Sequence, residues 1–314
     1  MLPANIKDPL IFIVGPTGVG KTRFAIEFAE SINGEIISAD SRQIYRQMNI
    51  GTAKPTLEEL ARVKHHLVDI IDPDEPWSLS SFLERSKKAV VEIEEKGKVP
   101  IVVGGTGQYV HSLIFGWTPP SVTANPELRN AIEKLGEAIG ARSLHEKLQR
   151  IDPEAANNIQ YQNMRRTVRA LEVIFTTGEL FSVQKRSGDR QFSTLTFGLS
   201  LPRADLYRRI DERIDQMVLE GLVYEVERLR NLGFSWSLPS MSSIGYKEIN
   251  SFLNGEVSLD EAVKLVKRHT REYVRRQANW FKADDPEIHW IEASPNAHEQ
   301  ALKIIGYKTN WNET

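Results

Sequence analysis

The stretch Leu10-Ile-Phe-Ile-Val-Gly-Pro-Thr-Gly-Val-Gly-Lys-Thr22 decides the fold class of this chain. It opens with five apolar residues, a run typical of a buried parallel strand. The second half, residues 15–22, matches the pattern G-x-x-x-x-G-K-[ST] of a phosphate-binding loop. A strand that runs through such a loop into a helix predicts a P-loop core of the nucleotide-binding type.

The loop also predicts a ligand. Its glycines let backbone N–H groups converge on a phosphate, which also meets the positive end of the following helix. Lys21 adds a point charge, and the hydroxyl of Thr22 suits Mg²⁺. We therefore predict a diphosphate site with Mg²⁺ as cofactor and Thr22 as the metal ligand. The predicted loop residues are Gly15, Pro16, Thr17, Gly18, Val19, Gly20, Lys21 and Thr22.

Short apolar runs recur along the chain, with helical patterns between most of them. This alternation predicts an α/β fold with a parallel sheet. The rhythm breaks after Trp117, where a mainly helical stretch begins. We predict a core made of residues 1–117 and 190–314, with a helical insertion at 118–189. Further strands are expected at Glu35–Ser38, Leu67–Ile70, Val99–Val103, Leu195–Leu199 and Ile288–Ile291, and long helices at 204–230 and 259–282.

Composition narrows the possible functions. The chain has 314 residues, 40% of them hydrophobic, enough to bury a full core. It has no cysteine, which excludes disulfides, zinc–thiolate sites and cysteine nucleophiles. The run Leu10–Val14 is too short for a signal peptide or a membrane span, so we expect a cytoplasmic protein without a membrane partner.

Charge is unevenly distributed. The net charge is −2, yet residues 264–282 hold seven Lys and Arg against one acid, Glu272. Local clustering of this kind favours a polyanionic partner. The alternative is a solvated helix face, which is the commoner use of a charge run. A second cluster at Arg165, Arg166 and Arg169 shifts the balance towards RNA.

Two carboxylates bear on the chemistry. A P-loop ATPase carries an Asp after a later strand, but Val99–Val103 is followed by Gly104-Gly-Thr106. Asp69, within the expected strand Leu67–Ile70, could substitute, in a weaker context. Asp40 follows the second strand, and ligands of open parallel sheets bind beyond such carboxyl ends. The alternative is that Asp40 caps the next helix.

Six separated segments resemble the tRNA dimethylallyltransferase family and occur in its order. They are residues 15–22, Asp40-Ser-Arg-Gln-Ile-Tyr-Arg-Gln-Met-Asn-Ile-Gly-Thr-Ala-Lys-Pro55, Gly104-Gly-Thr-Gly-Gln-Tyr109, Arg165-Arg-Thr-Val-Arg-Ala-Leu-Glu172, Ser243-Ile-Gly-Tyr-Lys247 and Arg268-His-Thr-Arg-Glu-Tyr-Val-Arg-Arg-Gln-Ala-Asn-Trp-Phe281. The chain departs from the family pattern at Asn49, where Asp is common, and near Ser242, where a basic residue is missing.

The resemblance implies a fold and an activity. The fold is a P-loop core with a helical insertion that contacts tRNA. The reaction transfers a dimethylallyl group from dimethylallyl diphosphate to N6 of adenine 37, beside the anticodon, in a channel through the core. The implied partners are dimethylallyl diphosphate and the tRNA anticodon stem-loop, and we expect a monomer.

The same resemblance implies roles for matching residues. Asp40 corresponds to the general base, Arg213 to an arginine acting on the diphosphate, and Thr22 completes the catalytic set. From spacing alone, Arg209 and Arg213 could equally be surface cations paired with Asp211 or Glu212. The residues implied to bind tRNA are Asp40, Ser41, Arg42, Gln43, Thr106, Thr123, Arg165, Arg166, Arg169, Lys247, Arg271 and Arg275.

Three other functions remain compatible with the pattern. A small-molecule kinase could use Arg165, Arg166 and Arg169 as a lid, but the missing strand-end Asp counts against it. An RNA-binding, NTPase-like switch and a prenyltransferase acting on free adenine nucleotides are the others. The insertion and the basic C-terminal helix favour a macromolecular acceptor.

Overall fold

The computed structural model describes residues 9–117, 125–184 and 190–306. Thr123, implied to bind tRNA, lies outside these ranges. The chain divides into two compact units. One is built from the chain up to Ile114 and from Gln191 onward, and the other is Phe115–Arg190. That these units act as the separate core and insertion domains assigned from the sequence stays a prediction.

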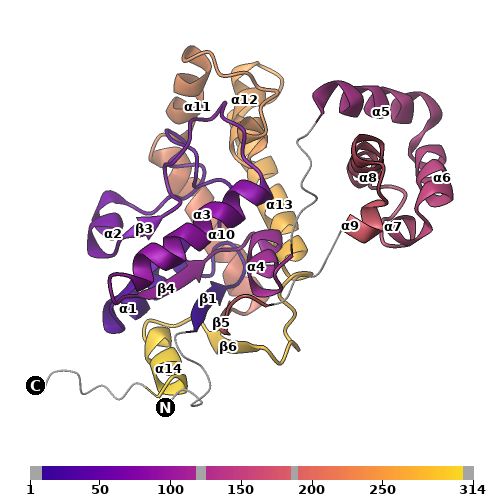
Figure 1. The fold of residues 1–314 in the computed structure, drawn as a ribbon. Coiled ribbons are helices and arrows are strands. Elements are labelled where there is room, and N and C mark those ends of the chain that lie inside the picture. Colours follow the sequence, from indigo (N-terminus) through magenta and orange to yellow (C-terminus); the bar gives the residue numbers. More distant parts are fainter. Residues whose placement is uncertain (1–8, 118–124, 185–189, 307–314) are drawn as a thin grey trace, which may run out of the picture. The chain divides into compact units, whose positions relative to one another are not determined.

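The first unit contains a six-stranded, entirely parallel sheet, so the expected α/β fold class is confirmed (Figure 1). The strand order is β3-β2-β4-β1-β5-β6. The strands are β1 (Leu10–Val14), β2 (Gly34–Ser38), β3 (His65–His66), β4 (Val99–Val103), β5 (Thr194–Ser200) and β6 (Ile288–Glu292).

The expected strand at Leu67–Ile70 is wrong. The chain pairs with β2 only at His65 and His66. Leu67 and Asp69 then adopt the left-handed backbone conformation, with φ of 62° and 55°. A residue in that conformation cannot continue an extended strand, so the apolar run ends in an irregular turn. Asp69 therefore does not lie in a strand.

Helices surround the sheet. Two expectations are corrected: the helix expected at 204–230 is broken at Gly221, which has φ of 103°, and the helix expected to reach residue 282 ends at Gln277. The helices of this unit are α1 (Lys21–Ser31), α2 (Leu57–Arg62), α3 (Leu79–Glu94), α4 (Gly107–Ile114), α10 (Arg203–Leu219), α11 (Leu222–Asn231), the 3₁₀ helix η1 (Ser240–Ser242), α12 (Tyr246–Leu253), α13 (Leu259–Gln277) and α14 (Ala297–Ile304).

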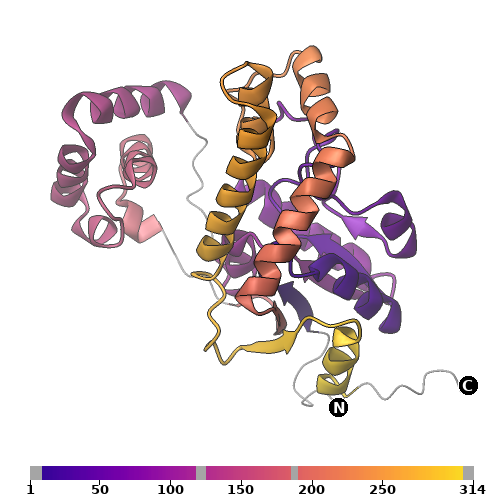
Figure 2. The ribbon, with the colours of Figure 1, turned by 180° about the vertical axis from the view of Figure 1, so that it is seen from behind.

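One core cluster joins the sheet to α1, α10, α13 and α14. Alternate strand residues such as Ile13 and Phe197 point into it, because successive side chains of a strand face opposite sides. The helices α10 and α13 lie side by side and add Ile210 and Val266 to the same cluster (Figure 2). The two long helices are therefore held firmly to the sheet.

A separate cluster anchors the segment that follows β2. Ile44 and Met48 of this segment pack with Val226 of α11 and Tyr246 of α12. These helices occupy the upper part of Figure 1. The chain after β2 is therefore shaped by helices far from it in sequence.

The second unit is helical throughout its described part, with its own core around Ile132, Leu148 and Leu171. Its helices are α5 (Pro126–Ile139), α6 (Ala141–Ile151), α7 (Pro153–Asn157), α8 (Met164–Thr177) and α9 (Phe181–Gln184). Within the ranges that the structure describes, none of the helices in either unit has the length and apolar character needed to cross a bilayer.

Candidate active site

The phosphate loop joins β1 to α1, as the sequence predicts. The Lys21 side chain is partly buried, and its ammonium donates hydrogen bonds to the carbonyls of Gly15 and Pro16, each at 2.9 Å. Burial lowers the pKa of Lys21, Asp40 opposes this shift and Arg213 adds to it, and the resulting pKa is about 8. A cation held in this way lacks an anionic partner in the loop itself.

Asp40 leaves the carboxyl end of β2 and accepts a hydrogen bond from the Arg42 N–H at 2.8 Å. No helix begins between β2 and Leu57, where α2 starts. Asp40 is therefore the cap of a tight turn and not of a helix, so the helix-cap alternative is wrong. The turn aims its carboxylate into a cavity.

Arg213 projects from α10 into the same cavity. Burial lowers the pKa of its guanidinium, while the charge of Asp40 opposes that shift. Arg209, one turn earlier, is exposed beside Gly20 and Arg23 in another hollow. The surface-cation alternative therefore holds for Arg209 and fails for Arg213.

The cavity has a volume of about 340 Å³ and two kinds of wall. Asp40 is its one acidic residue among the described lining. The polar wall adds Thr17, Ser41, Arg42, Arg213, Tyr273 and Arg276, and the apolar wall is formed by Ile210, Ile214, Met217, Leu222 and Val266. Such a space can hold a charged head group beside a short hydrocarbon chain.

Close packing explains why no carboxylate follows β4. A Cβ at Gly104 would lie 2.3 Å from the backbone oxygen of Ala39, so no side chain fits. Two residues later, the Thr106 hydroxyl accepts a hydrogen bond from the Ser41 N–H at 3.2 Å. The loop after β4 thus braces the turn that carries Asp40, and it supplies no acid for ATP hydrolysis.

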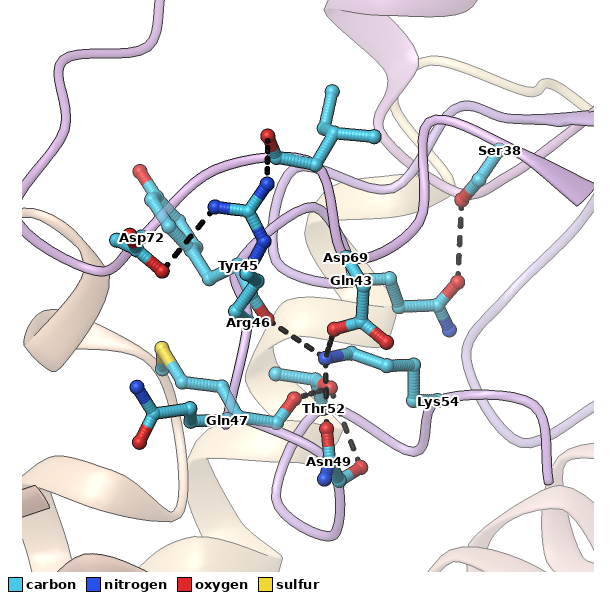
Figure 3. A network of polar contacts seen from close by, with 12 residues as sticks. Ser38, Gln43, Tyr45, Arg46, Gln47, Asn49, Thr52, Lys54, Asp69 and Asp72 are labelled. Atoms are coloured by element: carbon cyan, nitrogen blue, oxygen red, sulfur yellow. Dashed lines mark hydrogen bonds and ion pairs between the residues drawn. The ribbon is translucent and has the colours of Figure 1, made fainter. Parts of the chain in front are cut away.

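A buried lysine organises the segment after that turn (Figure 3). Lys54 Nζ donates to the Tyr45 carbonyl at 2.7 Å and to Asn49 Oδ1 at 2.9 Å, and it pairs with Asp69. Burial lowers the pKa of Lys54, and Asp69 opposes the shift. Asp69, a possible metal ligand by sequence, is therefore a counter-ion that holds the chain in place.

Glu225 of α11 also holds this segment, through hydrogen bonds. Its carboxylate accepts hydrogen bonds from the N–H groups of Asn49, Ile50 and Gly51 at 2.8, 2.9 and 3.1 Å. It also accepts a hydrogen bond from the Tyr246 hydroxyl at 2.6 Å. Gly51 lines the cavity, so Glu225 shapes its wall although it does not line it.

Two residues implied to bind tRNA are already engaged within the protein. Arg42 donates to the Pro239 carbonyl at 2.6 Å and reaches the Ser242 hydroxyl at 3.5 Å. Arg42 thus places a guanidinium beside Ser242, where the chain lacks the family's basic residue. The side chain of Gln43 accepts from Ser38 and donates to the Ala53 carbonyl.

The basic stripe of α13 forms a groove with Tyr207 of α10, but much of its charge is neutralised. Arg271 pairs with Asp211, and Lys267 pairs with Asp215 at 2.6 Å. Lys264 pairs with Asp260 on its own helix. Arg268 and Arg275 are exposed and have no carboxylate partner in the described parts of the chain. The groove is lined by Tyr207, Lys264, Lys267, Arg268, Arg271 and Arg275.

The remaining implied tRNA contacts differ in exposure. Arg165 and Arg166 are exposed at the start of α8, whereas Arg169 pairs with the buried Glu172 at 3.0 Å. Arg129 pairs with the same carboxylate at 2.7 Å. Lys247, in the first unit, is exposed on α12. Their contact with tRNA stays a prediction.

The sequence reasoning missed Gln277, the last residue of α13. It is buried, accepts the Thr17 N–H at 2.9 Å and donates to the Gly105 carbonyl at 3.0 Å. A signal existed: Thr270, Val274, Gln277 and Phe281 recur at helical spacing and face inward. The surrounding arginines obscured it.

Comparison with known proteins agrees with this arrangement. The family model described as IPP transferase matches residues 43–284, and one described as isopentenyl transferase matches residues 9–72. A protein of Roseiflexus sp. named tRNA dimethylallyltransferase is 47% identical over 95% of this chain and 97% of its own.

Solved structures point to the same family. The tRNA isopentenylpyrophosphate transferase of Bacillus halodurans is 39% identical, with a TM-score of 0.70 over 96% of this chain and 95% of that one. A eukaryotic dimethylallyltransferase described as acting on tRNA is 28% identical, with a TM-score of 0.81 over 96% of this chain and 79% of that one. With its phosphate loop, Asp40 turn and parallel sheet in place, the chain belongs to the IPP transferase family, that of the tRNA dimethylallyltransferases.

Proposed function

We propose that the chain transfers the dimethylallyl group of dimethylallyl diphosphate to N6 of adenine 37 in tRNA and releases diphosphate. The observation that carries this is the shared cavity of Asp40, Arg213 and Thr17. One carboxylate, a partly buried cation and the edge of a phosphate loop meet there beside an apolar wall. A prenyl diphosphate and an adenine amino group require this combination.

The cations act on the leaving group. As the C1–O bond to diphosphate breaks, the electron pair stays with the diphosphate oxygen. Lys21 and Arg213 are charged groups already held in low-dielectric surroundings, where they stabilise such charge more strongly than in water. The low-dielectric surroundings of Lys21 and Arg213 therefore help to stabilise the transition state, although they destabilise the protein before diphosphate binds.

Asp40 acts on the acceptor. The adenine N6 is a weak nucleophile because its lone pair is delocalised into the ring. As N6 bonds to C1, a proton leaves N6, and the Asp40 carboxylate can accept it. The adenine must leave the anticodon-loop stack to reach Asp40, which costs less in a single-stranded loop than in a duplex.

Mg²⁺ is part of the proposal. In the described residues no three Asp, Glu or His side chains gather into a metal cage. The Thr22 hydroxyl, at the start of α1, is the protein oxygen that we assign to this ion. Mg²⁺ is commonly held by one or two protein oxygens together with substrate phosphates and water, and it would neutralise diphosphate charge here.

The test is product analysis. Purified protein is incubated with an anticodon stem-loop RNA, Mg²⁺ and labelled dimethylallyl diphosphate, and the nucleosides are identified by mass spectrometry. We expect one prenylated adenosine per RNA and an equal amount of diphosphate. Labelled ATP and free AMP serve as competing substrates; phosphoryl transfer, or prenylation of AMP alone, would overturn the proposal.

We also expect the protein to act as a monomer in the cytoplasm, and light scattering can test its oligomeric state.

A further inference from the structure

The phosphate loop is tied to the end of α13 by one side chain. Gln277 is 3% exposed and makes two hydrogen bonds to backbone groups of different loops. Its Oε1 accepts the N–H of Thr17 at 2.9 Å, and its Nε2 donates to the carbonyl of Gly105 at 3.0 Å. Gln277, the last residue of α13, thereby joins the loop after β1 to the loop after β4.

The bridge admits only one amide orientation. The Thr17 N–H is a donor and the Gly105 oxygen an acceptor, so exchanging the oxygen and nitrogen of Gln277 would place like groups together at both ends. Space is equally restricted, because a Cβ at Gly105 would lie 2.2 Å from Nε2. The contact is therefore a specific polar joint and not general packing.

We propose that Gln277 is a positioning residue of the diphosphate site. It holds the Thr17 end of the phosphate loop and so fixes the loop amides that face the ligand; the Val19 N–H is not one of them, because it donates to the Pro16 carbonyl at 3.4 Å. Gln277 holds the loop without adding negative charge where an anion binds. The inference rests on the proposed function, because it takes the loop to be the site of the donor's diphosphate.

Two substitutions separate the charge of this residue from its hydrogen bonds. Gln277→Glu keeps the shape and an acceptor for Thr17, but when ionised it repels both the Gly105 oxygen and a bound diphosphate. Gln277→Met keeps approximate size and loses both hydrogen bonds. Gln300→Glu, on the exposed face of α14, makes the same charge change away from every cavity lining described above and serves as control.

The probe is inorganic diphosphate with Mg²⁺, titrated calorimetrically into each full-length variant. We expect Gln277→Glu to weaken binding about tenfold or more at pH 8, since like charges at close range repel strongly. Gln277→Met should weaken it by only about threefold to tenfold, the contribution of ordinary hydrogen bonds. Gln300→Glu should bind as the wild type does.

The pH dependence distinguishes positioning from mere structure. Burial raises a carboxyl pKa, and the protonated carboxyl that Gln277→Glu introduces can donate to Gly105 much as the amide does. The deficit of Gln277→Glu relative to wild type should therefore grow between pH 6 and pH 8. Each variant is measured well below its own melting midpoint, so that unfolding does not contribute to the deficit.

Each outcome decides something. Equal diphosphate affinity in wild type and Gln277→Glu at pH 8 would overturn the positioning role while leaving the donor site intact. So would equal deficits in Gln277→Glu and Gln277→Met with no dependence on pH. If the wild type itself binds no diphosphate, both this inference and the assignment of the phosphate loop fail.

Discussion

Two sets of cations on neighbouring elements differ in whether a carboxylate pairs with them. Arg213 lines the cavity and Lys21 ends the phosphate loop; both are partly buried, burial lowers the pKa of each, and neither forms an ion pair within the described residues. On the groove between α10 and α13, Lys267 and Arg271 are also partly buried, but each has a carboxylate partner. A buried cation without a partner destabilises the folded chain, so its retention indicates an anion that arrives later.

The helix α10 separates the two sets. Asp211 and Asp215 face the cations of α13, while Arg213 between them points into the cavity. Counting charges along the sequence would rank the α13 groove as the stronger anion site. Pairing in three dimensions reverses that ranking, because a cation already matched by a carboxylate offers less to a phosphate.

The most severe test removes the cavity's acid. Asp40→Asn keeps an acceptor for the adenine N6–H but takes up no proton, so we expect kcat to fall by about 10²–10⁴. The tRNA KM should change far less, because phosphate contacts dominate that interface. Single-turnover prenyl transfer measures the loss.

Asp215→Asn is the matched control on the groove, and it should transfer at the wild-type rate. Wild-type turnover by Asp40→Asn would assign proton removal to another group or to water. Asp40 would then be only the turn cap seen in its bond to Arg42.

We expect a smaller loss of activity when the charge of Lys21 is removed. Lys21→Ala should lower kcat/KM for dimethylallyl diphosphate by about 10²–10³, the range found when one preorganised group facing developing charge is lost. Lys267→Ala, in the groove, should leave that parameter near its wild-type value. Similar losses in both variants would mean that pairing with a carboxylate does not distinguish the two sets.

The pKa of Lys21 near 8 predicts a pH profile. The ammonium is charged below that pKa and lost above it, so the KM for dimethylallyl diphosphate should rise above about pH 8. Lys21→Arg, whose guanidinium stays charged, should abolish this limb. Because the folded pKa is lowered, this group favours folding as pH rises from about 8 towards 10.5, so weaker binding there would not reflect unfolding by Lys21. Thermal melts over the same range check this.

The smallest expected effect concerns tRNA binding by Arg271 and Arg275 of the groove. Arg275 has no carboxylate partner in the described chain, so Arg275→Ala should reduce the salt slope of tRNA binding by about 0.9, as for one lost phosphate contact. Arg271→Ala should change that slope less and the melting temperature more, since it leaves Asp211 unpaired. The reverse pattern in filter-binding titrations and melts would show that Arg271 exchanges Asp211 for phosphate.

Local patterns predicted the parts of the site that depend on strand ends. Residues 15–22 and Asp40 follow β1 and β2, and a parallel sheet brings such ends together whatever the rest of the chain does. The sequence could not show that Leu67 and Asp69 take left-handed conformations, because a four-residue segment with three apolar side chains fits a strand equally well.

The long-range contacts escaped prediction for another reason. Glu225 binds amides about 175 positions away, and Gln277 binds Thr17 across 260. Both residues lie in helices that contain many charged residues. A single buried polar side chain is hard to recognise in such a sequence. Helical spacing identifies an inward face, but it does not identify the loop that this face meets.

The hydrogen bonds from residues 49–51 to the Glu225 carboxylate also have a consequence for folding. Three successive amides are protected by a carboxylate that arrives only when α11 docks, so this wall of the cavity cannot form during early, local folding. In native-state hydrogen exchange, the N–H groups of Asn49, Ile50 and Gly51 should exchange together, with one opening free energy. Their common rate would report how often the helical cover lifts from an otherwise intact sheet.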